Sequence, residues 1–506
     1  MLARTEVEWL IDNAETYGRL LESLRGARHS VRIAQLAFDA DCAVYAGDSL
    51  SGSSPDDTVI AEILIALAQD HDVEIRIVLN ATWILDTARP LRKFFARRGI
   101  AREKIEVRGL SRFPHFMHAK IVIVDEREAF LIGSPFVNSY WDSGAHIPFD
   151  ARRPLRELGG RPLHDVSMRL SGPIVGDVGR MFAEVWRAAD ETDAGVQPRH
   201  ESSELPNAAS SVRLVCDAPD GILSGVADRA MQMLVELLAG IARARSFIYI
   251  EHQYLASRPI VAALADALRR TPALEIIIVL NQNPDITAYR GWQNAQLREH
   301  GLLAHPRVGV FSLWSTDADP AHAGVTRINQ LFIHSKVIVV DDDWAAVGTS
   351  NLDGVSMGDY GDDFASALGR RIFRGVRNVE VNVVIDAARG VDGDSDAADT
   401  IVALRERLWR EHLGVTREEL AVGAHGGWLA TWREAARARA ERLASMGGSD
   451  QTTAIAGRLL PYSASAYPRD QLADAGITLD PARLTLCYNP TRFGVYASPH
   501  WIRNIF

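Results

Sequence analysis

The sequence HAKIVIVD at residues 118–125 recurs as HSKVIVVD at residues 334–341. Each copy places a histidine and a lysine two positions apart at the head of a β-branched run, which predicts a strand. In an extended strand, residues i and i+2 project from the same face, so the imidazole and the ammonium group point in one direction. The aspartate, seven positions after the histidine, falls on the opposite face. We therefore expect Asp125 and Asp341 to fix the strand ends as structural acids rather than to contact a ligand.

Small polar residues follow both copies of this motif. Gly-Ser comes after the first copy at residues 133–134, and GTSN after the second at residues 348–351. A tight turn with hydroxyl and amide groups beside a His-Lys face predicts a pocket for an anion. Phe136 takes the position of Asn351 in the first copy, so Asn138 is the candidate amide there. The predicted phosphate-binding residues are Ser134, Asn138, Thr349 and Asn351.

The duplication makes these short motifs specific. A single H-x-K occurs by chance in many chains, whereas two H-x-K-x4-D motifs, each followed by Gly and a hydroxyl residue, favour a functional pair. This pattern, with G-T-x-N after the second copy, resembles the phospholipase D superfamily. IYIEHQYL at residues 248–255 is similar to a strand of that family, with His252 where asparagine is usual, and the resemblance covers about residues 31–414. Further similar segments are HDV at 164–166, GP at 172–173, NVEVN at 378–382 and LRERLWREHLG at 404–414.

The order of predicted elements indicates a duplicated α/β domain. The order strand, helix, strand at residues 30–80 recurs at residues 246–281, a spacing far longer than a solenoid repeat. A helix is expected from about residue 6 to residue 28. The resemblance implies two pseudo-twofold-related lobes, each an α/β/α sandwich with a mixed sheet flanked by helices. The expected units are an N-terminal lobe at 1–197, a linker at 198–211, a C-terminal lobe at 212–420 and an extension packed on the lobes at 421–506.

The composition is that of a large folded protein. The chain has 506 residues, 47% of them hydrophobic, and three scattered cysteines that indicate no disulfide framework. A formal net charge of −10 disfavours a protein that tracks a nucleic-acid backbone. The first residues do not show a basic segment followed by an apolar run, and no stretch approaches the roughly twenty apolar residues of a membrane span. We expect a monomer that is cytoplasmic or peripheral to a membrane.

Two His-Lys faces at one site suit a phosphodiester, because they supply two groups that titrate near neutrality and two positive charges. One imidazole attacks phosphorus and forms a phosphohistidine, while the other protonates the departing alcohol and then deprotonates the incoming water or alcohol. Lys120 and Lys336 would hold the non-bridging oxygens. We expect no metal and no cofactor, because the lysines replace a divalent ion and the sequence shows no ligand spacing. By resemblance, His118 is the nucleophile and His334 the acid and base.

Each of these histidines needs its second ring nitrogen held, and a carboxylate is the usual partner. Asp165 and Glu380 are the candidates, since each lies on a predicted strand about forty-five residues past a motif histidine. Both segments resemble those that carry the histidine-orienting acids of the family. We expect Asp165 to serve His118 and Glu380 to serve His334.

The resemblance implies a phospholipase D that hydrolyses phosphatidylcholine-like lipids at a membrane surface to phosphatidic acid and the head-group alcohol, with alcohol transfer possible. A cardiolipin synthase-like phosphatidyltransferase uses the same intermediate, although bacterial forms usually carry amino-terminal spans that this sequence does not show. A metal-independent phosphodiesterase or nuclease is disfavoured by the acidic balance. A silent lipid-binding scaffold would have lost a histidine or lysine, and both motifs are whole.

Overall fold

A computed structural model of the chain describes residues 4–45, 58–82, 85–112, 115–154, 160–189, 210–219, 222–223, 231–359, 375–389, 395–423, 427–445 and 457–487. The predicted linker at 198–211 lies outside these ranges except for its last two residues, and so does the chain from residue 488. In the described ranges, no helix combines the length and apolar character needed to cross a bilayer.

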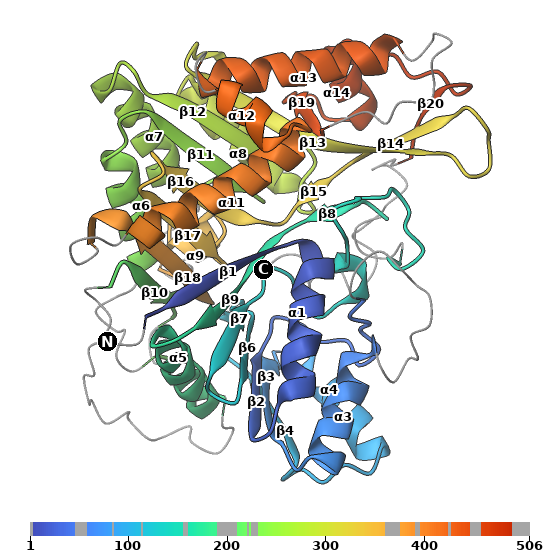
Figure 1. Cartoon of the computed structure of the whole chain (residues 1–506), viewed down its shortest axis with the longest axis vertical. Helices are drawn as coiled ribbons and strands as arrows, with labels where there is room; N and C mark the ends of the chain where they lie inside the picture. Colours follow the sequence, from blue (N-terminus) through green and yellow to red (C-terminus); the bar gives the residue numbers. More distant parts are fainter. Residues whose placement is uncertain are drawn as a thin grey trace, which may run out of the picture.

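The first half of the chain forms a seven-stranded mixed sheet in the order β1-β9-β7-β6-β2-β3-β4 (Figure 1). Helices α1, α3 and α4 cover one face of this sheet and α5 covers the other. The strands are β1 Glu6–Ile11, β2 Ser30–Ala34, β3 Glu74–Asn80, β4 Ile105–Leu110, β6 Ile121–Val124, β7 Glu128–Leu131 and β9 Val166–Ser171. The helices are α1 Asp12–Gly26, α3 Ile60–Asp70, α4 Ala88–Arg97 and α5 Ile174–Ala188.

The second half repeats this order as β10-β18-β17-β16-β11-β12-β13, with the same parallel and antiparallel pairings. The prediction of a duplicated α/β/α sandwich is therefore confirmed. The strands are β10 Val212–Asp217, β11 Phe247–His252, β12 Glu275–Leu280, β13 Val308–Ala318, β16 Lys336–Val340, β17 Trp344–Gly348 and β18 Asn378–Asp386. Helices α6 Gln232–Ala242, α7 Arg258–Arg270 and α8 Thr287–Glu299 pack on one face, and α11 Ser395–Leu413 on the other.

The helix expected from residue 6 to residue 28 is wrong in its first six residues. Glu6–Ile11 forms strand β1, which pairs antiparallel with β9. Trp9 and Ile11 enter one hydrophobic core and Leu10 enters the other, as the two faces of a strand require. The helix begins only at Asp12, whose positive φ of 63° turns the chain out of the strand. Pairing at the sheet edge thus overrides the helical spacing of the leucines that follow.

The C-terminal extension becomes part of the second lobe. Helix α13 (Trp428–Ser445) packs against β12 and β13, where the buried Trp432 contacts the rings of Tyr249 and Trp409. The extension also adds strands to the second sheet, because it pairs with β13 and with β14 (Thr326–Gln330). Its other elements are α12 Arg417–Gly423, β19 Leu459–Pro461, α14 Pro468–Asp474 and β20 Leu484–Leu486.

Two short parallel strand pairs join the lobes. In one pair, β5 (Phe116–Met117) of the first lobe lies beside β18 of the second. In the other, β15 (Phe332–Ile333) of the second lobe lies beside β8 (Leu163–His164) of the first. Each pair ends one residue before a motif histidine. The seam between the lobes is therefore built from the segments that lead into the two motifs.

The two motif aspartates occupy equivalent turns, directly after the motif strands β6 and β16. Asp125, after β6, accepts hydrogen bonds from the backbone N–H groups of residues 28–30 at 2.7–3.2 Å. Asp341, after β16, accepts them from residues 245–247 at 2.6–2.8 Å. Each carboxylate thus holds the start of the neighbouring strand, β2 or β11, against the motif strand.

We predict that Asp125→Asn lowers the free energy of unfolding by about 1–3 kcal/mol, because the amide has one acceptor oxygen and turns its own N–H groups toward backbone donors. Asparagine tolerates the positive φ of 53° at this position, so the loss reports the hydrogen bonds. Urea denaturation measures the effect. Glu126→Gln, at an exposed neighbouring position, is the matched control and should change stability by less than about 0.5 kcal/mol. Equal losses in both variants would contradict the assignment.

Candidate functional site

At the seam, each motif histidine forms a backbone hydrogen bond with the opposite lobe. The His118 N–H donates to the carbonyl of Val379 on β18 at 3.0 Å. The His334 N–H donates to the carbonyl of His164 on β8 at 2.8 Å. Each histidine therefore continues a strand pair that began in the other half of the chain. Both side chains are buried.

The orienting carboxylates are exchanged between the lobes. His118 Nδ1 lies 2.8 Å from Glu380 Oε2, and His334 Nδ1 lies 2.8 Å from Asp165 Oδ2. The expectation that each acid serves the histidine of its own half is wrong. The register explains the exchange, since β5 pairs Met117 with the residue before Glu380 and β15 pairs Ile333 with the residue before Asp165. Parallel pairing then sets each acid beside the histidine of the other lobe.

The two lysines are buried next to their histidines. Lys120 Nζ donates to the His118 carbonyl at 2.8 Å, and Lys336 Nζ donates to the His334 carbonyl and to Gln253 Oε1. Burial and the charge of Lys336 lower the pKa of Lys120 to about 7. Burial lowers the pKa of Lys336 to about 8. The charge of Lys336 lowers the pKa of His118 as well as that of Lys120, and the charge of Lys120 lowers the pKa of His334, so the groups of the two motifs belong to a single site.

The imidazoles are neutral in the free protein. Burial lowers the pKa of His118 to about 4 and that of His334 to about 3, against the opposing effect of the carboxylates. Burial alone would raise the pKa of Asp165 and Glu380, but the neighbouring histidines and lysines outweigh it and lower both. The acids are therefore ionised and hold the Nδ1–H tautomer, which leaves Nε2 of each ring as a free base.

The predicted phosphate-binding hydroxyls hold the acids. Ser134 Oγ donates to Asp165, and Thr349 Oγ1 donates to Glu380 at 2.6 Å. Glycine is required at position 133, because a Cβ there would lie 2.0 Å from Asp165 Oδ1. The small residues after each motif thus make room for an acid and fix it.

The two amides predicted to bind phosphate have different surroundings. Asn351 is buried, three residues after the end of β17. Asn138, in a short helical turn at Asn138–Tyr140, accepts from the Ala43 N–H at 2.8 Å and donates to the Asp41 carbonyl at 3.1 Å. Both of its side-chain groups hold the loop before residue 46, and the structure does not bring it to the motif pair.

Three further residues near the histidines were missed from the sequence. Ser356 and Asn378 donate to Glu380 Oε1 at 2.7 and 3.2 Å. The ring of Tyr140 meets His334 edge-on at 5.1 Å between centroids. Asn378 could have been found, because it lies two residues before Glu380 on the same face of a strand. Ser356 and Tyr140 come from segments without a recognisable motif.

A buried group of histidines and carboxylates lies directly behind Asp165. Burial lowers the pKa of His146, but Asp12, Asp142 and Glu411 outweigh it and raise the pKa to about 9. The field in this region therefore favours a positive charge. The sequence predicts no such cluster, because its members come from segments far apart in the chain. The two overlapping sets with metal-ligand spacing among the described residues are Asp12, His146, His164 and Glu411, and His164, Glu251 and His412.

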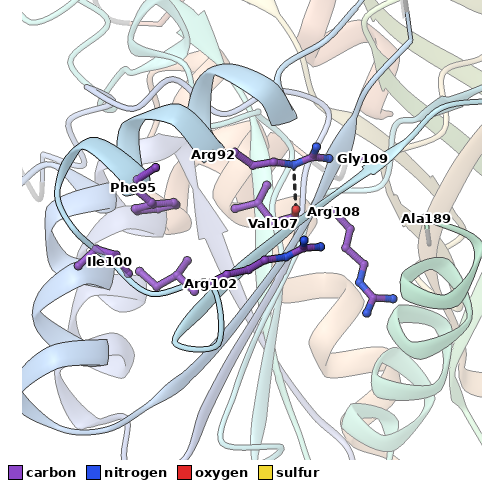
Figure 2. A pocket seen from close by; sticks show the side chains of 10 residues that line it. Arg92, Phe95, Ile100, Arg102, Val107, Arg108, Gly109 and Ala189 are labelled. Atoms are coloured by element: carbon purple, nitrogen blue, oxygen red, sulfur yellow. Dashed lines mark hydrogen bonds between the residues drawn. The ribbon is translucent and has the colours of Figure 1, made fainter. Parts of the chain in front are cut away.

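A separate cavity of about 380 Å³ lies between α4 and the edge strand β4 (Figure 2). Arg92, Arg102 and Arg108 line it together with Phe95 and Ile100. The cavity contains no residue of the paired motifs, and among its described lining residues no histidine or carboxylate supplies acid–base chemistry. The candidate catalytic centre is therefore the seam and not this cavity.

The sequence matches the family described as "Cardiolipin synthase, PLD-like domain" over residues 20–138 and 237–409. Cardiolipin synthase A of Pseudomonas putida (strain W619) is 24% identical over 357 residues, covering 70% of this chain and 63% of that protein. Phospholipase D alpha 1 of Ricinus communis is 23% identical over 415 residues, covering 60% of this chain and 49% of that protein. The crystal structure of phosphatidylserine synthase from Haemophilus influenzae Rd KW20 aligns with a TM-score of 0.47 and 11% identity, over 78% of this chain and 86% of that one.

The chain thus spans less than two thirds of the length of these two curated relatives. The family match nevertheless covers more than half of the chain, and its two segments contain both H-x-K-x4-D motifs. On these grounds the chain belongs to the phospholipase D superfamily of enzymes.

Proposed function

We propose that the protein is a phosphatidyltransferase that moves the phosphatidyl group of one phospholipid to a hydroxyl group of another through a phosphohistidine. The observation that carries this proposal is the pair of carboxylate-held imidazoles with two buried lysines at one seam. The family match and the cardiolipin synthase relatives favour transfer over the hydrolysis that the sequence first indicated. The acceptor class would then be the glycerol head group of a second lipid.

In the first step, His118 attacks the phosphodiester. Its Nδ1–H is held by Glu380, so the lone pair of Nε2 points away from the acid. A bond forms between Nε2 and phosphorus, and the bond from phosphorus to the head-group oxygen breaks. The departing oxygen takes a proton from Nε2 of His334. The products are a phosphatidyl-histidine and a free alcohol.

In the second step, the roles of the rings reverse. His334 removes the proton of the acceptor hydroxyl, whose oxygen attacks phosphorus, and the bond to His118 breaks. His334 must carry an extra proton for the first step, although burial and the lysines lower its pKa in the free protein. A bound phosphodiester brings a negative charge that offsets the lysines, and this raises the pKa of His334 when it is needed.

Hydrolysis is the second candidate, favoured by the match to phospholipase D alpha 1 and by the family-like strand at residues 248–255. Water then replaces the acceptor alcohol in the second step, and phosphatidic acid is the product. Both reactions share the intermediate, so they differ only in which acceptor reaches phosphorus.

We predict that vesicles of phosphatidylglycerol, without added divalent ions, yield cardiolipin and glycerol, with phosphatidic acid as a minor product. Lipid mass spectrometry and a glycerol assay measure the ratio. His118→Ala and His334→Ala should each lose at least about 10³-fold in rate. His322→Ala, at an exposed histidine, is the matched control and should keep full activity. If phosphatidic acid is the sole lipid product, the reaction is hydrolysis and the transfer proposal is wrong.

We predict that variants of the two histidines behave differently in a burst experiment with a phosphatidyl ester of p-nitrophenol. This leaving group needs no proton, so His334→Asn should release about one equivalent of p-nitrophenol and then stall at the phosphohistidine. His118→Asn should give no burst, because no nucleophile is present. Stopped-flow absorbance and phosphohistidine detection measure the outcome. A burst in His118→Asn but not in His334→Asn would show that His334 is the nucleophile and His118 the acid and base.

We predict that anion binding weakens as the pH rises, because the two lysines lose their protons near neutrality. The affinity for dibutyl phosphate, which stays a monoanion throughout, should fall about tenfold per pH unit between about pH 7 and about pH 8, where one lysine has lost its proton. Above about pH 8, where both lysines have lost theirs, it should fall by up to about a hundredfold per unit. Calorimetric titration from about pH 6 to about pH 9 tests this. Lys120→Met should bind weakly at every pH. An affinity that stays constant over this range would contradict a role for the lysines.

A further inference from the structure

The cluster behind Asp165 joins the two lobes. Asp12 begins α1, His146 follows the turn at residues 138–140, and His164 ends β8, all in the first lobe. Glu411 comes from α11 of the second lobe. The first three side chains are buried, and Glu411 is 19% exposed. None of the four takes part in the proposed phosphoryl transfer.

The donor atoms of this cluster have the spacing of a metal coordination shell. His146 Nε2 lies 2.8 Å from Glu411 Oε1 and 3.4 Å from Asp12 Oδ2. His164 Nδ1 lies 3.0 Å from Asp12 Oδ1 and 3.6 Å from Glu411 Oε1. Tetrahedral zinc with bonds of about 2.0–2.1 Å separates its ligand atoms by about 3.3 Å. One ligand atom from each of the four side chains lies within 4.8 Å of the others, which is close enough for all four to reach one such ion.

Two buried polar atoms in the cluster have close neighbours but no aligned hydrogen bond. Among the described residues, Asp12 Oδ2 and His164 Nδ1 have no well-aligned hydrogen-bond partner, although His146 Nε2 and Asp12 Oδ1 lie 3.4 and 3.0 Å from them. An unsatisfied buried polar atom is costly, and a cation that accepts the lone pairs removes the cost. If binding displaces a proton from each imidazole, the two carboxylates balance the charge of one divalent ion.

The outer groups orient the two imidazoles toward the same point. His146 Nδ1 lies 3.2 Å from Asp142 Oδ2, and His164 Nε2 lies 3.1 Å from Glu251 Oε1. A carboxylate on the far nitrogen is the usual support of a metal-bound histidine, because it fixes the tautomer and the ring direction. Glu251 is held in turn by Tyr249, Ser335 and His412.

A path from the surface reaches the cluster. A cavity of about 350 Å³ is lined by Asp12 and Glu411, and by Arg407 and Arg410 at its side. An ion can therefore enter between α1 and α11 without opening the seam.

We propose that Asp12, His146, His164 and Glu411 bind one zinc-class divalent ion that fastens the lobes together. Histidine nitrogen and carboxylate oxygen are ligands that zinc accepts in a four-coordinate site. The ion would touch no reacting atom of the proposed phosphoryl transfer.

The ion would also position the catalytic pair. The Asp12 N–H donates to the Asp165 carbonyl at 2.9 Å, and the Asp165 N–H donates to Asp12 Oδ1 at 3.2 Å. Asp165 in turn holds His334. Fixing Asp12 by coordination therefore fixes the backbone that carries the acid. These four residues are positioning residues for the seam.

The full chain, dialysed against chelator and then freed of it, tests the proposal with Zn²⁺ and Co²⁺ directly. Calorimetry should show one equivalent of Zn²⁺ bound with a Kd below about 1 μM. Co²⁺ should give the visible absorption of a four-coordinate site, and Zn²⁺ at 100 times its Kd should stabilise the fold by about 2.7 kcal/mol. Absence of saturable Zn²⁺ binding by the unmodified chain would overturn the proposal, whatever the catalytic assays show.

Variants locate the ion. Glu411→Gln and His146→Gln should each weaken Zn²⁺ binding at least about tenfold and change the Co²⁺ spectrum. Glu411 is partly exposed, so its variant is the safer one if His146→Gln fails to fold. His322→Gln, at an exposed histidine outside the cluster, is the matched control and should bind Zn²⁺ as the unmodified chain does. Binding that survives Glu411→Gln unchanged, or that is lost in His322→Gln as well, would place the ion elsewhere and refute this site.

Discussion

The structure depends on two parallel strand pairs that cross from one lobe to the other. Each is only two residues long, yet each fixes the register of a motif histidine against a strand of the opposite sheet. A shift by one residue would turn the following side chain to the other face and separate the imidazole from its acid. The hydrogen bonds of His118 and His334 to backbone carbonyls of the other lobe prevent such a shift. Neither lobe by itself pairs its motif histidine with the acid that holds it.

This arrangement places like charges together at the seam. Lys120 and Lys336 are almost fully buried, and burial opposes the charge of both. The ionised Asp165 and Glu380 offset part of this positive charge. In the proposed reaction, a bound phosphodiester would offset more of it, at a place where the ammonium groups are prearranged and water is largely excluded. The burial that lowers the lysine pKa values would then favour an anionic ester as substrate.

Much of the fold and of the motif pair could be predicted from the sequence, because a motif that occurs twice with the same residue spacing rarely arises by chance. The strand-helix-strand order at residues 30–80 and 246–281 indicates two similar α/β halves, whereas the order of the strands in each sheet was not predicted, and edge strand β1 was predicted as part of a helix. The exchange of Asp165 and Glu380 could not be predicted. The sequences of the two halves would be the same whether each acid held the histidine of its own lobe or that of the other lobe. The hydroxyls of Ser134 and Thr349 were expected to bind phosphate but hold the acids, a distinction that depends on Å-scale distances. The cluster behind Asp165 could not be predicted, because its residues come from four segments that are far apart in the sequence and form no short motif.

The two halves match in their strands but differ around their acids, and this difference supports distinct roles. Glu380 is a longer side chain held by several donors, whereas Asp165 is held through its own backbone as well as by a hydroxyl. A nucleophilic ring must keep one direction while it is free and while it carries phosphorus, which suits the more extensively bonded carboxylate beside His118. An acid–base ring must change its charge during turnover, which suits His334, whose acid is tied to the buried cluster of titratable groups. Duplication supplied two equal histidines, and the residues behind them make them unequal.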